Sequence, residues 1–318
     1  MKAENIRKIL IEGAGTMGTS MAKIFAENGY SVVLHGRHQE TLDRAQKRLE
    51  DIVMQDEKNG KCSAESGRVL LDRIRLTLAW EDFADSDILI ENIAENLEIK
   101  QAFYRKASPL MKEDALITTN TSGLSITALA EAVVKPERFV GFHWFNPPHL
   151  IPLIEVIAGG HTEESAVDAV YALAEAIGKK PIRVKKDVPG FIANRIQLAI
   201  LRECIYMKEE GIGDFEDIDR AMKYGLGFRY ACLGPFEVCD QGGLDIFYSI
   251  SKYLYPDLSA AQSPEGLFAD IVEKGNYGVK NGSGFYDYSE GKAAASVQKR
   301  DMLYQRLAEA DIHREVES

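Results

Sequence analysis

The stretch from Lys8 to Leu34 constrains the fold of this chain more than any other part of the sequence. An apolar run leads directly into Gly13-Ala14-Gly15-Thr16-Met17-Gly18, and a helix-like segment closed by Gly29 then leads into a second apolar run. Strand, GxGxxG, helix and strand within about 30 residues form the context in which this motif binds the pyrophosphate of a dinucleotide.

Each glycine of this motif has a separate task in such a site. Gly13 would permit the tight turn, Gly15 the close approach of the phosphates, and Gly18 the close packing of the helix on the sheet. Thr16 and Met17 open the helix, whose N-terminal amides would donate to the phosphates. The sequence therefore predicts a dinucleotide-binding domain.

The end of the second apolar run indicates which dinucleotide is preferred. NAD-binding proteins normally place Asp or Glu there to bond the ribose 2′-hydroxyl, whereas NADP-binding proteins lack that acid and place a cation nearby. Here the segment is Leu34-His35-Gly36-Arg37-His38, so Gly36 occupies the acid position and Arg37 follows it. A guanidinium can pair with a 2′-phosphate in a bidentate way, which favours NADP(H). The alternative is that Arg37 is a solvated loop residue or stacks on the adenine.

Two further apolar runs end in polar residues. Ile88-Leu89-Ile90 is followed by Glu91 to Leu97, and Leu116 to Thr119 is followed by Asn120-Thr121-Ser122. Ligands of doubly wound sheets bind at the carboxyl ends of the strands, so we expect these polar residues beside the ligand. The alternative for the second cluster is a plain helix cap.

His143 and Glu155 form a candidate acid–base pair. His143 ends an apolar run just before a double-proline turn, and Glu155 interrupts the apolar run Leu153 to Ile157. A carboxylate in a buried strand carries a desolvation cost unless it is paired, and a neighbouring histidine is its natural partner. The alternative is that His143 is a hydrogen-bonded core residue and Glu155 lies on an exposed strand face.

Length, charge and cysteine content limit the possible classes of protein. With 318 residues and 45% hydrophobic content, the chain can bury the cores of two domains. The net charge of -11 argues against a nucleic-acid-binding or anionic-membrane surface. Four cysteines without CxxC spacing indicate reduced thiols and no metal site. A strand-like run beginning at Ile6 leaves no room for a signal segment, so we expect a cytoplasmic location.

The pattern of the sequence changes after Asp187. Strand-like runs alternate with helices over residues 1–187, which predicts a doubly wound Rossmann-type α/β domain, and only helices are expected over residues 188–318. The long helix Phe191 to Glu210 carries Asn194 in its first turn, and a terminal helix is expected from Ala293 to Ile312.

A helical hairpin is expected within the first domain, from Gln39 to Lys58 and from Ala64 to Leu71. Lys58 and Lys61 at its turn are candidates for binding an anionic tail of the substrate. The alternative is that they belong to a solvated charged face.

Taken together, these motifs resemble those of the L-3-hydroxyacyl-CoA dehydrogenases, from Gly13 to about Tyr288. Besides the glycine motif, the match comprises Glu95-Asn96-Leu97, Asn120-Thr121-Ser122, His143 to Pro147, Leu153 to Ile157, Asp187 to Arg195, Gly234 to Glu237 and Gly284 to Tyr286. The resemblance implies a doubly wound N-terminal domain, an all-helical C-terminal domain that forms a homodimer, and an active site between them.

The resemblance also implies roles for individual residues. His143 would be the catalytic base and Glu155 its partner, while Ser122 and Asn194 would contact the substrate oxygen. Four more residues match family positions near the nicotinamide, namely Glu95, Lys100, Asn146 and Lys280. Histidine suits the role of base because it can take up and return a proton at neutral pH.

The leading interpretation is a short-chain 3-hydroxyacyl-CoA dehydrogenase, of the 3-hydroxybutyryl-CoA type, that uses NADP(H) or the family default NAD(H). The loop Gly225 to Leu233 is longer than in typical acyl-CoA members and resembles relatives acting on free hydroxy acids, where Arg229 would hold a carboxylate. Trp144 with Pro147-Pro148-His149 is similar to a branch that oxidises pyridine carboxylates. A crystallin-like relative without catalysis is a further alternative.

Overall fold

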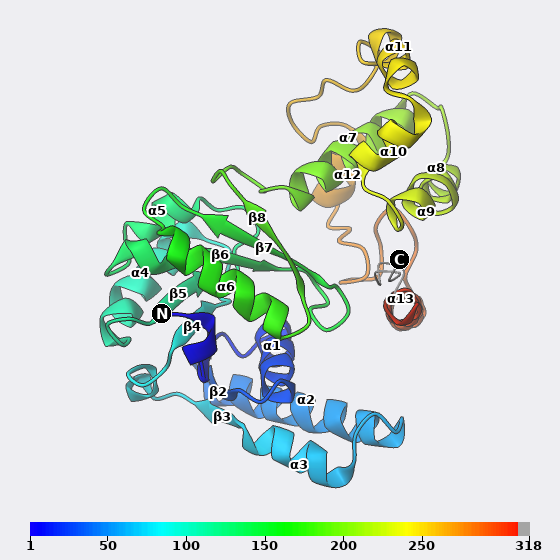
Figure 1. Ribbon diagram of the computed structural model, residues 1–318. Helices are drawn as coiled ribbons and strands as arrows, with labels where there is room; N and C mark the ends of the chain where they lie inside the picture. The colour runs from blue at the N-terminus through cyan, green and yellow to red at the C-terminus, as the bar shows by residue number, and fades with distance from the viewer. Residues whose placement is uncertain (311–318) are drawn as a thin grey trace, which may run out of the picture. The chain divides into compact units, whose positions relative to one another are not determined.

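The structure is a computed structural model that describes residues 1–310 (Figure 1). The chain forms two compact units, Met1–Arg195 and Ile196–Ser318. The first unit includes the start of helix α7 (Ala193–Glu209), so Asn194 belongs to it. No helix within the described residues is long and apolar enough to cross a membrane.

An eight-stranded sheet forms the centre of the first unit. Its strand order is β3-β2-β1-β4-β5-β6-β7-β8, and the neighbouring strands are parallel except for the antiparallel pair β6 and β7. The order from β3 to β6 is that of the doubly wound dinucleotide-binding fold, so the predicted fold class is confirmed. The strands are β1 (Lys8–Glu12), β2 (Ser31–His35), β3 (Ile74–Thr77), β4 (Ile88–Glu91), β5 (Leu116–Thr119), β6 (Phe139–Trp144), β7 (Leu153–Ala158) and β8 (Lys180–Val184).

Two hydrophobic clusters fill the two faces of this sheet. Successive strand residues point to opposite faces, and Ile9 and Ile11 accordingly belong to one cluster while Leu10 belongs to the other. The first cluster includes residues of helices α1 (Thr16–Glu27), α2 (Gln39–Lys58) and α6 (Glu164–Ala176), and the second includes residues of α4 (Leu97–Ala107) and α5 (Ile126–Ala130). Helix α3 (Ala64–Asp72) and short 3₁₀ turns at Ala3–Asn5, Trp80–Phe83, Ser108–Leu110 and Pro136–Arg138 complete the unit.

The second unit is helical, as expected. Its β-structure within the described residues consists of two isolated bridges, Gly278 with Ser283 and Ser283 with Asp287. After α7 follow α8 (Phe215–Ala221), a π-helical turn (Met222–Leu226), α9 (Gly227–Tyr230), α10 (Pro235–Gly242), α11 (Leu244–Leu254), α12 (Leu267–Glu273) and α13 (Lys292–Glu309). The last two residues of the expected terminal helix, 311 and 312, lie outside the described residues.

The sequence did not indicate strand β3. Ile74 and Thr77 are buried but Arg75 is exposed, so the strand shows neither a continuous apolar run nor a regular alternation. It lies at the edge of the sheet and pairs with β2. Hydrogen bonding to a neighbouring strand, which a single sequence does not reveal, is what makes this segment a strand.

Candidate active site

His143 and Glu155 lie directly opposite each other on the antiparallel strands β6 and β7. Their Nδ1 and Oε2 atoms are 2.8 Å apart, and the two residues are 3% and 0% exposed. The loop of residues 145–152 turns the chain back, which is why two residues so far apart in the sequence meet. A carboxylate can only accept a hydrogen bond, so Nδ1 donates and Nε2 keeps its lone pair. The arrangement provides a base at Nε2.

Glu155 also connects the sheet to the start of α7. Its Oε1 accepts hydrogen bonds from the amides of Ile192 and Ala193, at 2.9 and 2.8 Å. Burial acts to raise the pKa of the Glu155 carboxyl, but the hydrogen bonds from His143 and these amides outweigh it and hold the pKa below its ordinary value. The carboxylate therefore stays charged beside the imidazole at neutral pH.

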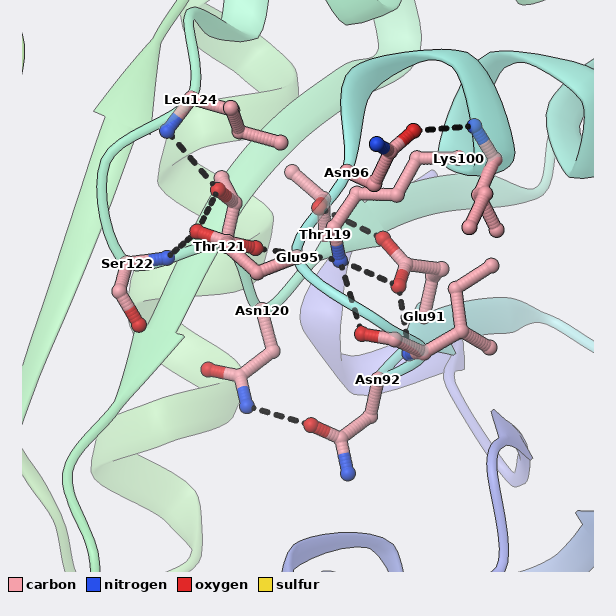
Figure 2. A network of polar contacts seen from close by, with 12 residues as sticks. Glu91, Asn92, Glu95, Asn96, Lys100, Thr119, Asn120, Thr121, Ser122 and Leu124 are labelled. Carbon is pink, nitrogen blue, oxygen red and sulfur yellow. Dashed lines mark hydrogen bonds and ion pairs between the residues drawn. The ribbon is translucent and has the colours of Figure 1, made fainter. Parts of the chain in front are cut away.

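The backbone of Ser122 is held from two sides. Its amide donates to Oε1 of Glu95 at 2.7 Å, and its carbonyl accepts from Nδ2 of Asn194 at 2.9 Å. The residue itself is exposed, so its hydroxyl is available to a ligand. Figure 2 shows Ser122 and Glu95 in the loops that follow β5 and β4. The expected substrate contacts Ser122 and Asn194 thus adjoin each other in the first unit.

A buried polar network lies beneath Glu95 (Figure 2). Lys100 is fully buried and donates to Oε1 of Glu91 at 2.6 Å, with Oε2 of Glu95 at 3.6 Å from the same ammonium. The other oxygen of Glu91 accepts from Tyr104 and Thr119, at 2.8 and 2.7 Å. Burial and the Glu91 charge raise the pKa of Tyr104 well above its ordinary value. The ammonium of Lys100 is thus enclosed by protein groups and orients Glu95.

Sequence reasoning missed the members of this network other than Lys100 and Glu95. Glu91 is a charged residue directly after the apolar run Ile88 to Ile90, and that signal could have identified it. Tyr104 and Thr119 carry no such signal, because a tyrosine in a helix and a threonine in a strand are ordinary.

The glycine motif forms a turn that fits a dinucleotide. Gly13 has a φ of +103°, and a Cβ on Gly18 would lie 2.0 Å from the carbonyl oxygen of Gly13, so neither position tolerates a side chain. A Cβ on Gly15 would meet nothing within 4 Å, which leaves open space above this residue. Helix α1 begins at Thr16 without a side-chain cap, so no side chain competes for its first amides. Gly13 to Gly18 would hold the pyrophosphate.

A buried pair, Glu12 and His35, lies at the ends of β1 and β2. Oε2 of Glu12 is hydrogen-bonded to Nδ1 of His35, and Nε2 of the same ring lies 3.2 Å from the carbonyl oxygen of Leu78. The sequence showed Glu12 only as a charged residue in an apolar strand, and this partner accounts for it. Gly36 packs against α2, while Arg37 is exposed.

The remaining candidate residues are all exposed, three in the first unit and two in the second. Asn146 is exposed in the loop after β6. Lys58 and Lys61 are exposed at the end of α2 and in the turn after it. Arg229 and Lys280 are exposed residues of the second unit. Among the described residues no cluster of His, Cys, Asp and Glu could hold a metal ion.

Two family models match the chain and together cover most of it. The NAD binding domain of 3-hydroxyacyl-CoA dehydrogenase matches residues 8–188, and the C-terminal domain of 3-hydroxyacyl-CoA dehydrogenase matches residues 190–288.

Two curated relatives match over nearly their full length. A 5-formyl-3-hydroxy-2-methylpyridine 4-carboxylate 5-dehydrogenase of Mesorhizobium japonicum is 37% identical over 299 residues, which are 93% of this chain and 95% of the relative. A 3-hydroxybutyryl-CoA dehydrogenase of Clostridioides difficile is 33% identical over 284 residues, 89% of this chain and 100% of the relative.

Solved structures give the same two kinds of relative. A crystal structure of 5-formyl-3-hydroxy-2-methylpyridine 4-carboxylic acid 5-dehydrogenase, described as an NAD+-dependent dismutase, has a TM-score of 0.86 at 36% identity and covers 96% of this chain and 98% of its own. The (S)-3-hydroxybutyryl-CoA dehydrogenase of Ralstonia eutropha has a TM-score of 0.75 at 33% identity and covers 90% and 100%.

Proposed function

The chain belongs to the 3-hydroxyacyl-CoA dehydrogenase family of NAD-dependent oxidoreductases, and we propose that it transfers a hydride between NAD(P) and a 3-hydroxy or 3-keto group. The observation that carries this proposal is the buried His143–Glu155 pair, which leaves Nε2 of His143 as a base. A crystallin-like relative without catalysis would have no need to keep a carboxylate at 0% exposure beside that imidazole.

The residues of the first unit supply the proton chemistry of such a reaction. Nε2 of His143 takes the proton of the substrate hydroxyl, and Glu155 stabilises the imidazolium that results. Ser122 and Asn194 hold the substrate oxygen, where negative charge develops. When bound, the nicotinamide supplies the hydride acceptor. In the direction of reduction, the same imidazolium returns the proton to the oxygen.

For the substrate we propose a short-chain acyl-CoA of the 3-hydroxybutyryl-CoA type. Lys58 and Lys61 support this proposal, because two exposed cations at the end of α2 suit a phosphate-bearing tail. The test is turnover of acetoacetyl-CoA with NADPH and with NADH. Charge reversal of Lys58 and Lys61 to Glu should raise the KM for acetoacetyl-CoA, whereas Lys47→Glu, an exposed position of the same helix, should leave it unchanged. If acetoacetyl-CoA is turned over with neither NADPH nor NADH, the acyl-CoA proposal is refuted.

A free carboxylate is the second candidate substrate. The structure of the pyridine carboxylate dehydrogenase matches 96% of this chain with a TM-score of 0.86, and this favours a small aromatic acid. In that case Arg229 would bind the carboxylate. Arg229→Met should then raise the KM for a pyridine carboxylate strongly, while Arg220→Met in the same unit should not. Equal KM values for the two variants would refute the role of Arg229.

We propose NADP(H) as the preferred cofactor. Glycine at position 36 leaves no carboxylate at the end of β2 to bond a ribose 2′-hydroxyl, and Arg37 is an exposed cation beside it. Glu12, the acid at the end of the neighbouring strand β1, is buried and engaged by His35.

We also propose that the second unit forms a homodimer. None of its described residues is buried, and it exposes large apolar side chains such as Phe236 at 84%, Tyr224 at 75% and Phe228 at 71%. A monomeric protein rarely leaves so much apolar surface in water. Light scattering of the purified protein measures the assembly, and a monomeric mass at micromolar concentration would contradict it.

A further inference from the structure

Lys179 is a buried cation without an acidic partner. It lies between α6 and β8, is 9% exposed, and its ammonium donates to the carbonyl oxygens of Pro148 and Ile151, at 2.5 and 2.9 Å. The ring centroid of Trp144 lies 5.6 Å from the same nitrogen. Within residues 1–310 we find no carboxylate paired with it. Two backbone carbonyls and an aromatic face are its surroundings.

Both carbonyls belong to the loop of residues 145–152, which joins β6 to β7. This loop leaves β6 directly after His143 and Trp144, carries Asn146, and enters β7 two residues before Glu155. Within the loop, the amides of Leu150 and Ile151 donate to the carbonyl of Pro147. Lys179, which lies outside the loop, therefore bridges Pro148 in its middle and Ile151 near its end.

Trp144 forms the floor beneath this ammonium. It is 3% exposed and packs edge-on against Phe25 and Phe142, in the cluster on the α1 face of the sheet. His143, the preceding residue of the strand, points to the other face, where it contacts Phe191. The Trp144 ring therefore lies on one side of the Lys179 ammonium, and the loop carbonyls that accept its hydrogen bonds are its other neighbours.

The ammonium costs stability where it lies. Burial lowers the pKa of Lys179 from 10.5 to about 8. Below pH 8 the residue is charged in both the folded and the unfolded chain, and only the folded chain carries the desolvation cost. Between pH 8 and 10.5 the unfolded chain binds more protons, so stability rises with pH across that window. Stability alone therefore does not account for a lysine at this position.

We propose that Lys179 is a positioning residue of the hydride-transfer site, whose ammonium fixes the loop 145–152 and thereby the placement of Asn146 and of the His143–Glu155 pair. This inference rests on the proposed function, which makes the His143–Glu155 pair part of a hydride-transfer site. The loop geometry on which it depends is independent of the substrate. Lys179 acts through the loop and has no role in contacting substrate.

The experiment compares Lys179→Met with Lys180→Met, a control at the neighbouring exposed lysine. Urea unfolding first establishes that both variants are folded. Hydrogen exchange of the amides of Leu150 and Ile151 then measures the order of the loop, and steady-state kinetics measures kcat and KM. We expect faster exchange in Lys179→Met and a kcat lower by about tenfold to 10²-fold, because small misplacements at a reaction centre are that costly. Lys180→Met should match the wild type in both.

Two results would overturn the inference. One is unchanged exchange in the loop of Lys179→Met, and the other is faster exchange with a kcat equal to that of Lys180→Met. A wild type without turnover of any tested substrate would overturn the proposed function instead. The NAD(P)H dissociation constants of the two variants then decide the role of Lys179, with an increase in Lys179→Met alone supporting it and equal values overturning it.

Discussion

Replacement of Glu155 by glutamine tests which ring nitrogen of His143 carries the proton. In the wild type, Oε1 of Glu155 accepts the amides of Ile192 and Ala193 and Oε2 accepts Nδ1 of His143. Backbone amides can only donate, so the single oxygen of a glutamine has to stay with them. Its NH₂ group then faces Nδ1, which must become an acceptor, and the ring proton moves to Nε2. The base is lost although the side chain keeps its shape.

The size of the effect follows from this loss. General acid–base catalysis contributes about 10²–10⁴-fold, so kcat should fall by that factor, which is a barrier increase of about 3–5 kcal/mol. One charge-assisted hydrogen bond is also lost, so the free energy of unfolding should fall by about 1–3 kcal/mol. The pKa of Glu155 is held below 4.5, so this stability difference is full above pH 4.5 and shrinks as pH falls through the folded-state pKa.

The assay is steady-state oxidation of NAD(P)H with acetoacetyl-CoA or a pyridine carboxylate, whichever the wild type turns over. Glu131→Gln, at an exposed position, is the matched control and should behave as the wild type. The cofactor dissociation constant, followed by nucleotide fluorescence, should change little in both variants. A folded Glu155→Gln protein with a kcat within about threefold of the wild type would refute the tautomer reasoning.

Three further predictions follow from the same structure. His143→Ala should abolish turnover and preserve cofactor binding, and substantial residual activity would refute its role as base. Arg37→Asp should shift the ratio of NADPH to NADH dissociation constants toward NADH by about tenfold or more, as loss of a charge-assisted pair requires, and an unchanged ratio would refute the cofactor assignment. From pH 8 to 10.5, the free energy of unfolding of the wild type, measured with urea, should rise relative to that of Lys179→Met by at most about 3 kcal/mol. A difference between the two proteins that does not change with pH would contradict the lowered pKa of Lys179.

Patterns of local sequence predicted the parts of this fold that depend on local rules. The glycine motif marks a turn at which side chains are sterically excluded, and the apolar runs described above coincide with the six strands β1, β2, β4, β5, β6 and β7. His143 and Glu155 could be paired because a charged residue in a buried strand requires a partner, and a histidine was near in the sequence.

The partners of the other buried polar groups depend on strand register and could not be predicted. Glu12 meets His35 because β1 and β2 are in parallel register at their last residues. Glu91 meets Thr119 in the same way on β4 and β5. Lys179 donates to backbone carbonyls, which are the same in every sequence, so no residue type reveals its role. These contacts became visible only with the order and alignment of the strands.

The pair of Glu12 and His35 limits how this cofactor domain can change by mutation. The His35 ring lies between two oxygen acceptors, because Nδ1 is hydrogen-bonded to the Glu12 carboxylate and Nε2 lies 3.2 Å from the Leu78 carbonyl oxygen. Loss of either residue alone would leave the other buried polar side chain without its partner, at a cost of about 1–3 kcal/mol. Relatives should therefore carry both residues or two apolar ones, so the two positions should covary across the family.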